Sequence, residues 1–252
     1  MSPRVVWIGA ALAAIAAAQP APPPNYVYEI WWEVYTNKGA ALTRYLTRLR
    51  EADLKTASGR RRFADIHPWS NRRIVSAPLV ELGDYDRRLE SATVFRQAFG
   101  DEEYRQYAAA LAEAQISRTS YLRKYRDDLS LHRDRHTRDG IRATAYSFVT
   151  VWPWKEPQFE QLWRRALAAY RKVAPEMVLT VAETLAGGGA QYVVARPLTS
   201  YAQFETDLTP EQAVEKAFGA AELEKFNRLV SETVRKWETF LFDKGNFDTN
   251  VR

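Results

Sequence analysis

The sequence predicts an α+β protein built from two copies of one unit, each with the order strand, helix, strand, strand, helix, strand. The main observation is an internal repeat. Ala98-Phe99-Gly100 recurs as Ala217-Phe218-Gly219, and the same offset (217 − 98 = 119) carries Pro78-Leu79 onto Pro197-Leu198. A constant offset across hydrophobic positions indicates a duplicated supersecondary unit. The second observation is that period-two and helical patterns alternate in the same order in both halves.

In the first copy, aromatic and β-branched residues alternate over 26–35 and predict a strand. A helix is predicted over 40–56, because Leu42, Leu46 and Leu49 fall on one face and charged residues on the other. Turn-forming residues at 68–71 separate two further strands. The remaining elements are predicted as strands at 62–66, 72–79 and 119–125 and a helix at 86–114 that is broken at Gly100.

The second copy repeats this order. Thr209 and Pro210 are typical of a helix start, since Thr caps the first turn and Pro fits the first helical position. Gly187-Gly188-Gly189 joins two strand patterns and predicts a hairpin. The predicted strands are 144–152, 177–184, 191–196 and 238–243, and the predicted helices are 158–173, a short one after Tyr201, one from Thr209 and a long one over 221–236.

These elements divide the chain into a first repeat at 26–126, a charged linker at 127–143 and a second repeat at 144–252. The order of elements in each repeat is that of the ferredoxin-like unit. Two such units in one chain resemble the fused form of the dimeric α+β barrel superfamily, which includes antibiotic-biosynthesis-type monooxygenases and NIPSNAP-type proteins. Tyr28-Glu29-Ile30, Gly39, Leu42 and Leu46 are similar to the NIPSNAP opening, although Asn37-Lys38 stands where Pro-Gly is common. The resemblance implies a pseudo-dimeric barrel and little chemistry.

Composition limits the function classes. The chain has 252 residues, 46% hydrophobic and 27% charged, which is typical of a globular protein. The formal net charge of +5 is small and its basic residues are interleaved with acids, so we expect no nucleic-acid partner. The absence of cysteine excludes thiolate zinc sites, iron–sulfur clusters, catalytic thiols and disulfides.

The N-terminus predicts export. Arg4 precedes a short apolar run that ends in Ala16-Ala17-Ala18, the pattern of a secretory signal peptide over residues 1–18. The run is too short for a spanning helix, so we expect no membrane span in the mature chain. A Pro-rich spacer at 19–25 follows. The predicted location is periplasmic or extracellular.

Three residues are candidates for catalysis. Glu29 and Glu33 share one face of the first strand with Trp31, and a carboxylate beside a large ring in a barrel interior could serve as a general base. His67 stands at the end of a strand. Chlorite-dismutase-type enzymes of similar architecture hold haem iron on a histidine of the second repeat, but residues 141–252 contain none, so no cofactor is predicted.

No metal site is predicted either. His132 and His136 have helical spacing, but they lie in an arginine-rich linker where a cation would be repelled.

Aromatic residues of the two first strands are candidates for ligand binding. Shifted by 120, Tyr28 and Trp32 fall on Phe148 and Trp152. Small residues suit close helix docking, so we expect the aromatic set to point into the barrel. The opposite orientation, with these rings in an ordinary core, stays open. The predicted ligand-binding residues are Tyr28, Trp31, Trp32, Phe148, Trp152 and Trp154.

Three functions remain open on the sequence. The leading interpretation is an exported protein that binds a small apolar or aromatic ligand. The second is a cofactor-free monooxygenase- or isomerase-like enzyme that uses Glu29, Glu33 or His67 as base. The third is a structural or interaction protein of the cell envelope. Whether the chain is an enzyme is left undecided, and it is expected to be a monomer with an internal pseudo-dimer, or a homodimer.

Overall fold

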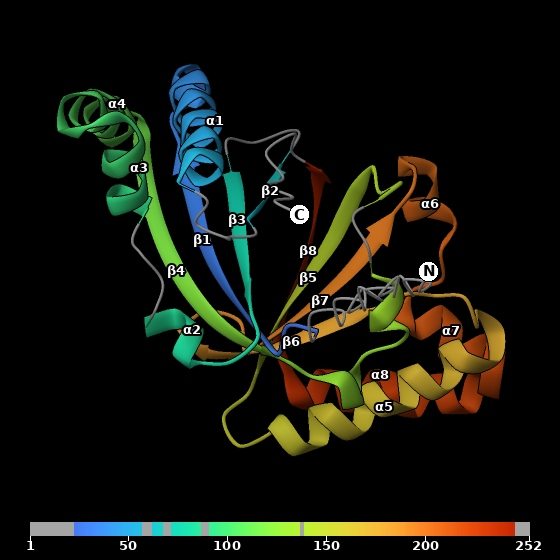
Figure 1. Cartoon of the computed structure of the whole chain (residues 1–252). Helices are drawn as coiled ribbons and strands as arrows, with labels where there is room; N and C mark the ends of the chain where they lie inside the picture. The colour runs from blue at the N-terminus through green and yellow to red at the C-terminus, as the bar shows by residue number, and fades with distance from the viewer. Residues whose placement is uncertain (1–22, 57–61, 68–71, 87–90, 137–138, 245–252) are drawn as a thin grey trace, which may run out of the picture.

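A computed structural model describes residues 23–56, 62–67, 72–86, 91–136 and 139–244 (Figure 1). The predicted signal peptide and most of the predicted spacer lie outside these residues. The first repeat contains four strands, β1 (Tyr26–Val34), β2 (Phe63–Ile66), β3 (Arg72–Leu79) and β4 (Gln115–Tyr125). Its helices are α1 (Gly39–Lys55), α2 (Gly83–Asp86), α3 (Ser91–Phe99) and α4 (Asp101–Ala114).

The second repeat has the same succession of elements. Its strands are β5 (Ala143–Val151), β6 (Thr180–Ala186), β7 (Tyr192–Leu198) and β8 (Val234–Lys244). Its helices are α5 (Glu156–Val173), α6 (Tyr201–Thr206), α7 (Pro210–Phe218) and α8 (Ala220–Thr233). Between β4 and β5 the chain forms two short 3-10 turns, η2 (Asp127–Leu129) and η3 (Arg133–Arg135), and a further one, η1 (Thr36–Lys38), precedes α1.

The eight strands form a closed barrel in the order β1-β3-β2-β8-β5-β7-β6-β4, and every neighbouring pair is antiparallel. Each repeat contributes four neighbouring strands in the same order, with β4-β1-β3-β2 matching β8-β5-β7-β6. The repeats join at two seams, β2 with β8 and β4 with β6. The predicted fold class, two ferredoxin-like repeats fused into a pseudo-dimeric α+β barrel, is confirmed. β1 and β5 run in the same direction on opposite sides of the barrel.

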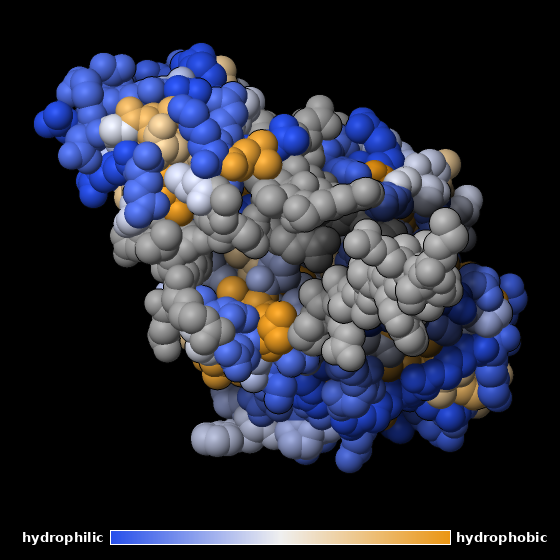
Figure 2. Space-filling view, viewed as in Figure 1, coloured by the Kyte–Doolittle hydropathy of each residue, from blue (hydrophilic) through white to orange (hydrophobic). Residues whose placement is uncertain are grey.

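Helices cover the outside of the barrel in two layers, α1, α3 and α4 over one half and α5, α7 and α8 over the other (Figure 1). Each layer encloses a hydrophobic core against its own strands. Hydrophilic residues predominate on the outer side of both layers, and hydrophobic residues are visible in the hollow between them (Figure 2). None of the helices in the described part of the chain is long and apolar enough to cross a membrane.

The duplicated glycines mark equivalent breaks. Gly100 separates α3 from α4 and Gly219 separates α7 from α8, and both have φ of +88°. Only glycine adopts this backbone conformation without strain. The predicted interruption of the helix at Gly100 is therefore confirmed, and the second copy has the same interruption.

Three predicted strand starts are wrong. β4 begins at Gln115 instead of residue 119, and β8 begins at Val234 instead of 238, because α4 and α8 pass directly into strands with no turn residues between them. At both junctions the cap residue is already extended, with ψ of 125° at Gln115 and 123° at Val234. β6 begins at Thr180 instead of 177, since Met177 belongs to the α5–β6 connection.

The predicted hairpin at Gly187–Gly189 joins β6 to β7. A Cβ atom on Gly187 would clash with the carbonyl oxygen of Ser120 on β4, and one on Gly189 would lie 3.3 Å from the ring of Tyr121. Both glycines have positive φ. The glycines thus allow this hairpin to lie against β4 beside the seam between the two repeats.

Candidate functional site in the barrel interior

The two faces of β1 have different surroundings, because alternate side chains of a strand point to opposite faces. Ile30 and Trp32 belong to the core under α1, α3 and α4, and Tyr28 packs against that core. Glu29 and Trp31 lie on the opposite face, which is the interior of the barrel. The acidic and aromatic pair identified in the sequence therefore does point inward.

β5 shows the same division. Val149 and Val151 belong to the core under α5, α7 and α8. Tyr146 and Phe148 lie on the opposite face, in the barrel. The rings of Trp31 and Phe148 meet across the barrel with centroids 4.8 Å apart and an edge-to-face angle of 79°.

Trp31 and Phe148 are part of a larger group of rings on the interior faces of four strands, joined by one ring just beyond the end of β2. Neighbouring centroids are 4.8 to 6.3 Å apart, within the range of favourable aromatic pairs. We call this group the ring cluster. Its members are Trp31, Tyr121, Tyr146, Phe148, Phe240, Phe242 and His67.

Glu29 forms a buried ion pair at one side of the ring cluster. Its Oε2 accepts hydrogen bonds from Nε of Arg123 at 3.0 Å and from Nε1 of Trp31 at 3.1 Å. The Arg123 side chain is 1% exposed, lies 4.6 Å from the ring centroid of Tyr121 and also donates to Thr184 Oγ1. One oxygen of the carboxylate that the sequence suggested as a base is thus held by two donors.

A second polar group lies at the other side of the ring cluster. Asp65 on β2 is 1% exposed, and the hydroxyl of Tyr146 donates to its Oδ2 at 2.8 Å. His67 follows two residues later, with its ring 5.3 Å from that of Phe242. Burial lowers the pKa of His67 below its ordinary value, and the nearby cations of Arg72 and Arg73 lower it further. The imidazole is therefore neutral at pH 7 and able to accept a proton.

Glu33 lies farther along the interior face of β1, near its end. Its carboxylate is 3.8 Å from Nε of Arg72, and both side chains are more than 40% exposed. Glu29 and Glu33 consequently differ in environment, one buried and paired, the other solvated. Of the three catalytic candidates, His67 is the one that is partly exposed and whose lowered pKa keeps it in the neutral form that can accept a proton.

The expectation that the aromatic set of the two first strands points inward is wrong for Tyr28, Trp32, Trp152 and Trp154. Tyr28 and Trp32 face the helices. Trp152 is 46% exposed and Trp154 is 89% exposed, both beyond the end of β5. Among the six candidates, Trp31 and Phe148 lie in the barrel.

The error has a definite cause in the register. Val27 pairs with Pro78, and Thr144 pairs with the equivalent Pro197, so the offset between the first strands is 117 (144 − 27 = 117) and not 120. A shift of three residues, an odd number, reverses the faces of a strand. The offset changes to 119 between β6 and β7, because eight residues separate the last paired residues Glu183 and Tyr192, whereas six separate the equivalent pair Ile66 and Arg73 of β2 and β3.

Six residues of the site were not identified from the sequence: Arg123, Tyr121, Asp65, Tyr146, Phe240 and Phe242. Asp65 stands two positions before His67, and this same-face spacing on a strand was a usable signal. Arg123 gave none, since it lies among other basic residues 94 positions away from its partner Glu29.

The linker histidines bind neighbouring chain segments. Nε2 of His132 lies 2.8 Å from the carbonyl oxygen of Pro175, and Nδ1 of His136 lies 2.6 Å from Oγ1 of Thr180. Within the described ranges, no group of three or more His, Cys, Asp or Glu residues is arranged to hold a metal ion.

Several solved structures have the same architecture as this chain. An anthrone oxidase-like protein superposes with a TM-score of 0.58 at 12% identity, covering 91% of this chain and 95% of that one. The chain has the fused dimeric α+β barrel fold. A candidate monooxygenase from Lactobacillus acidophilus NCFM (TM-score 0.51, 8% identity, 86% and 93% covered) and a candidate chlorite dismutase (0.51, 9%, 88% and 96%) are similar as well.

Comparison at the level of sequence gives no further similarity. No protein-family model matches the chain, and no curated protein matches it. At identities this low, the similarity to fused dimeric α+β barrels describes architecture, and the activity has to be argued from the site.

Haem, which chlorite-dismutase-type barrels bind, does not fit the residues of this barrel. The second repeat contains neither histidine nor cysteine. The space between its strands and helices is packed with its own rings, including Phe159, Trp163 and Tyr192, which are at most 2% exposed. His67 belongs to the first repeat and points into the barrel instead of toward the helices.

Proposed function

We propose that the protein binds a small planar aromatic molecule inside the barrel, against the ring cluster. One observation carries the proposal. Five of the seven rings remain partly exposed although they lie on interior faces, namely Trp31, Tyr121, Tyr146, Phe240 and His67. Flat partly exposed rings offer stacking and edge-to-face contacts to an aromatic ligand.

The polar groups beside these rings favour a weakly acidic ligand, such as a phenol. The Arg72 guanidinium lies 5.5 Å from the ring centroid of Phe240. Neutral His67 lies 6.0 Å from the same ring. A ligand hydroxyl near these groups would meet a proton acceptor and a cation that stabilises the resulting anion.

The binding is tested with 1-naphthol by isothermal titration calorimetry. Phe240→Ala should weaken binding at least tenfold, because it removes a partly exposed ring beside His67 without emptying a buried core. Tyr85→Ala, which removes a 43% exposed ring outside the barrel, should change it less than twofold. Native mass spectrometry of the protein from its host should show a retained aromatic compound. Absence of saturable binding, or equal binding by both variants, would refute the proposal.

A second candidate function is favoured by His67. A neutral imidazole among aromatic walls can remove an acidic proton from a bound aromatic substrate, and the resulting carbanion reacts with oxygen. The similar structures known as an anthrone oxidase-like protein and a candidate monooxygenase motivate the choice of substrate. The reaction to test is anthrone plus O₂ giving anthraquinone and water.

We expect wild-type protein to accelerate anthraquinone formation and oxygen uptake, and His67→Gln to abolish the acceleration. Because the pKa of His67 is lowered, the rate should be constant above pH 7 and fall on acidification with a midpoint below about 6.5, the ordinary histidine value. His132→Gln, a histidine replacement in the linker, is the matched control and should retain the rate. A His67→Gln variant as fast as wild type would eliminate this role.

A further inference from the structure

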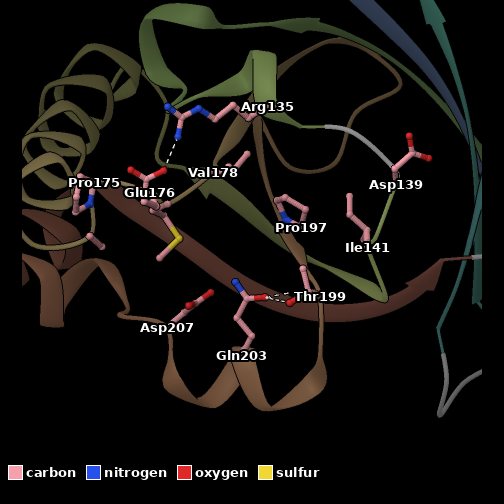
Figure 3. A pocket seen from close by; sticks show the side chains of 12 residues that line it. Arg135, Asp139, Ile141, Pro175, Glu176, Val178, Pro197, Thr199, Gln203 and Asp207 are labelled. Carbon is pink, nitrogen blue, oxygen red and sulfur yellow. Dashed lines mark hydrogen bonds and ion pairs between the residues drawn. The ribbon is translucent and has the colours of Figure 1, made fainter.

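A surface pocket of about 420 Å³ lies in the second repeat, apart from the barrel interior (Figure 3). Three chain segments form it: the linker before β5, the connection between α5 and β6, and the end of β7 with α6. The linker occurs once in the chain, so this pocket is not a duplicated feature. Its lining residues are Arg135, Asp139, Ile141, Ala174, Pro175, Glu176, Met177, Val178, Pro197, Thr199, Gln203 and Asp207.

Half of the lining is apolar. Ile141 and Pro197 lie on one side of the pocket and Pro175 on the other (Figure 3). Met177 is buried and Val178 half-buried. A volume of this size with an apolar wall is typical of a small-molecule site. The described lining residues include no aromatic ring, so they offer no surface for a cation–π contact with a quaternary ammonium group.

Asp207 is the chemically distinctive group. Its Oδ2 is buried and makes no hydrogen bond, although Nη1 of Arg196 lies 3.5 Å away as an ion-pair partner and the Gln203 side chain is a hydrogen-bond donor to the carboxyl group. Burial raises the pKa of this carboxyl group above its ordinary value. A carboxylate in this position gains from an added hydrogen-bond donor, since an unsatisfied buried acceptor is costly.

Gln203 is oriented beside it. Its Oε1 accepts hydrogen bonds from the backbone N–H of Thr199 at 2.8 Å and from its hydroxyl at 3.2 Å. The carboxamide is thereby fixed, and its side chain points into the pocket together with that of Asp207 (Figure 3).

The charges around the pocket favour a cation. Glu176 is paired with Arg135 at 2.6 Å, and Arg196 partly balances Asp207, so Asp139 is the excess negative charge among the described residues of the pocket. Half-enclosed charges are screened less than those on an open surface. An organic anion would meet three carboxylates here, whereas an ammonium group would meet an unsatisfied acceptor.

We propose that this pocket binds a small organic cation, a primary ammonium group on a short apolar or aromatic body. The ammonium group donates to Asp207, and the body lies against Ile141, Val178 and Pro197. The site is independent of the barrel interior and of the function proposed for it.

The test uses phenethylamine as the probe, with 3-phenylpropionate as an anion of similar size, in calorimetric titrations at pH 7. Wild type should bind phenethylamine saturably and bind phenylpropionate at least tenfold more weakly. Asp207→Asn should weaken phenethylamine binding at least tenfold. Asp134→Asn, an exposed linker residue outside the pocket, should leave it within twofold.

A second variant tests the location of the site without changing any charged residue. Val178→Trp places a large ring in the pocket and should abolish binding, with thermal unfolding confirming a folded protein. The proposal is overturned if wild type does not bind the amine saturably, if Asp207→Asn or folded Val178→Trp binds it like wild type, or if the anion binds equally well.

Discussion

Replacing Arg123 with leucine should lower the free energy of unfolding by about 3–5 kcal/mol. Arg123 is 1% exposed and pairs with Glu29, whose carboxylate is also buried. Without the guanidinium, that carboxylate retains one donor, Nε1 of Trp31, in an environment with little water. The expected loss of stability therefore comes from the Glu29 carboxylate, a buried charge left without its cation. It is measured as the free energy of unfolding in urea, with the m-values of wild type and variant compared.

Two controls define the cause. Arg105→Leu removes an ion pair with Glu102 of the same 3.0 Å length but with both side chains at least 70% exposed, and should change stability by less than about 1 kcal/mol. Glu29→Leu combined with Arg123→Leu should recover a large part of the loss, because no isolated charge remains. A loss in Arg123→Leu no larger than that in Arg105→Leu would contradict this account.

Trp32→Ala should also lower the free energy of unfolding by about 3–5 kcal/mol, as expected for removal of a large ring from a packed core. Trp32 is 4% exposed and lies among residues of α1 and α3, including Leu42 and Phe95. Its Nε1 is buried with no acceptor. Trp32→Phe keeps most of the ring and removes this unsatisfied donor, so it should cost much less than Trp32→Ala in chemical unfolding.

Trp154→Ala is the matched comparison. Trp154 is 89% exposed, so its replacement by alanine removes few contacts. Its φ is +67°, a conformation that is equally unfavourable for tryptophan and for alanine, so the substitution does not change the backbone strain. We expect a change within about 0.5 kcal/mol. Comparable losses at Trp32 and Trp154 would show that the burial assigned to the two rings is wrong.

The candidate site could be predicted in part. Period-two alternation placed Glu29, Trp31 and Glu33 on one face of β1, and the structure keeps them together. Alternation alone does not say whether that face meets helices or the barrel interior, because both environments are apolar. The pairing of Glu29 with Arg123 joins residues 94 positions apart, and that contact follows from the register of β1 against β4.

His67 illustrates the same limit. Its place at a strand end was visible in the sequence, but its lowered pKa depends on burial and on Arg72 and Arg73 across the β2–β3 connection. Its ring contacts reach Phe240 and Phe242 on β8, in the other repeat. A pattern read within one repeat cannot supply neighbours that come from the seam between two repeats.

The sequence by itself determined the duplication, the order of elements, the helix breaks at Gly100 and the hairpin at Gly187–Gly189, since these depend on local conformation and on residue spacing. Tertiary structure alone decided which strand faces meet. Two more residues separate the last paired positions of β6 and β7 than those of β2 and β3, so equivalent positions differ by 117 before these turns and by 119 after them. Because side chains alternate along a strand, the three-residue error in the first-strand offset placed Trp32 in the barrel, whereas packing places Trp31 there, opposite Phe148.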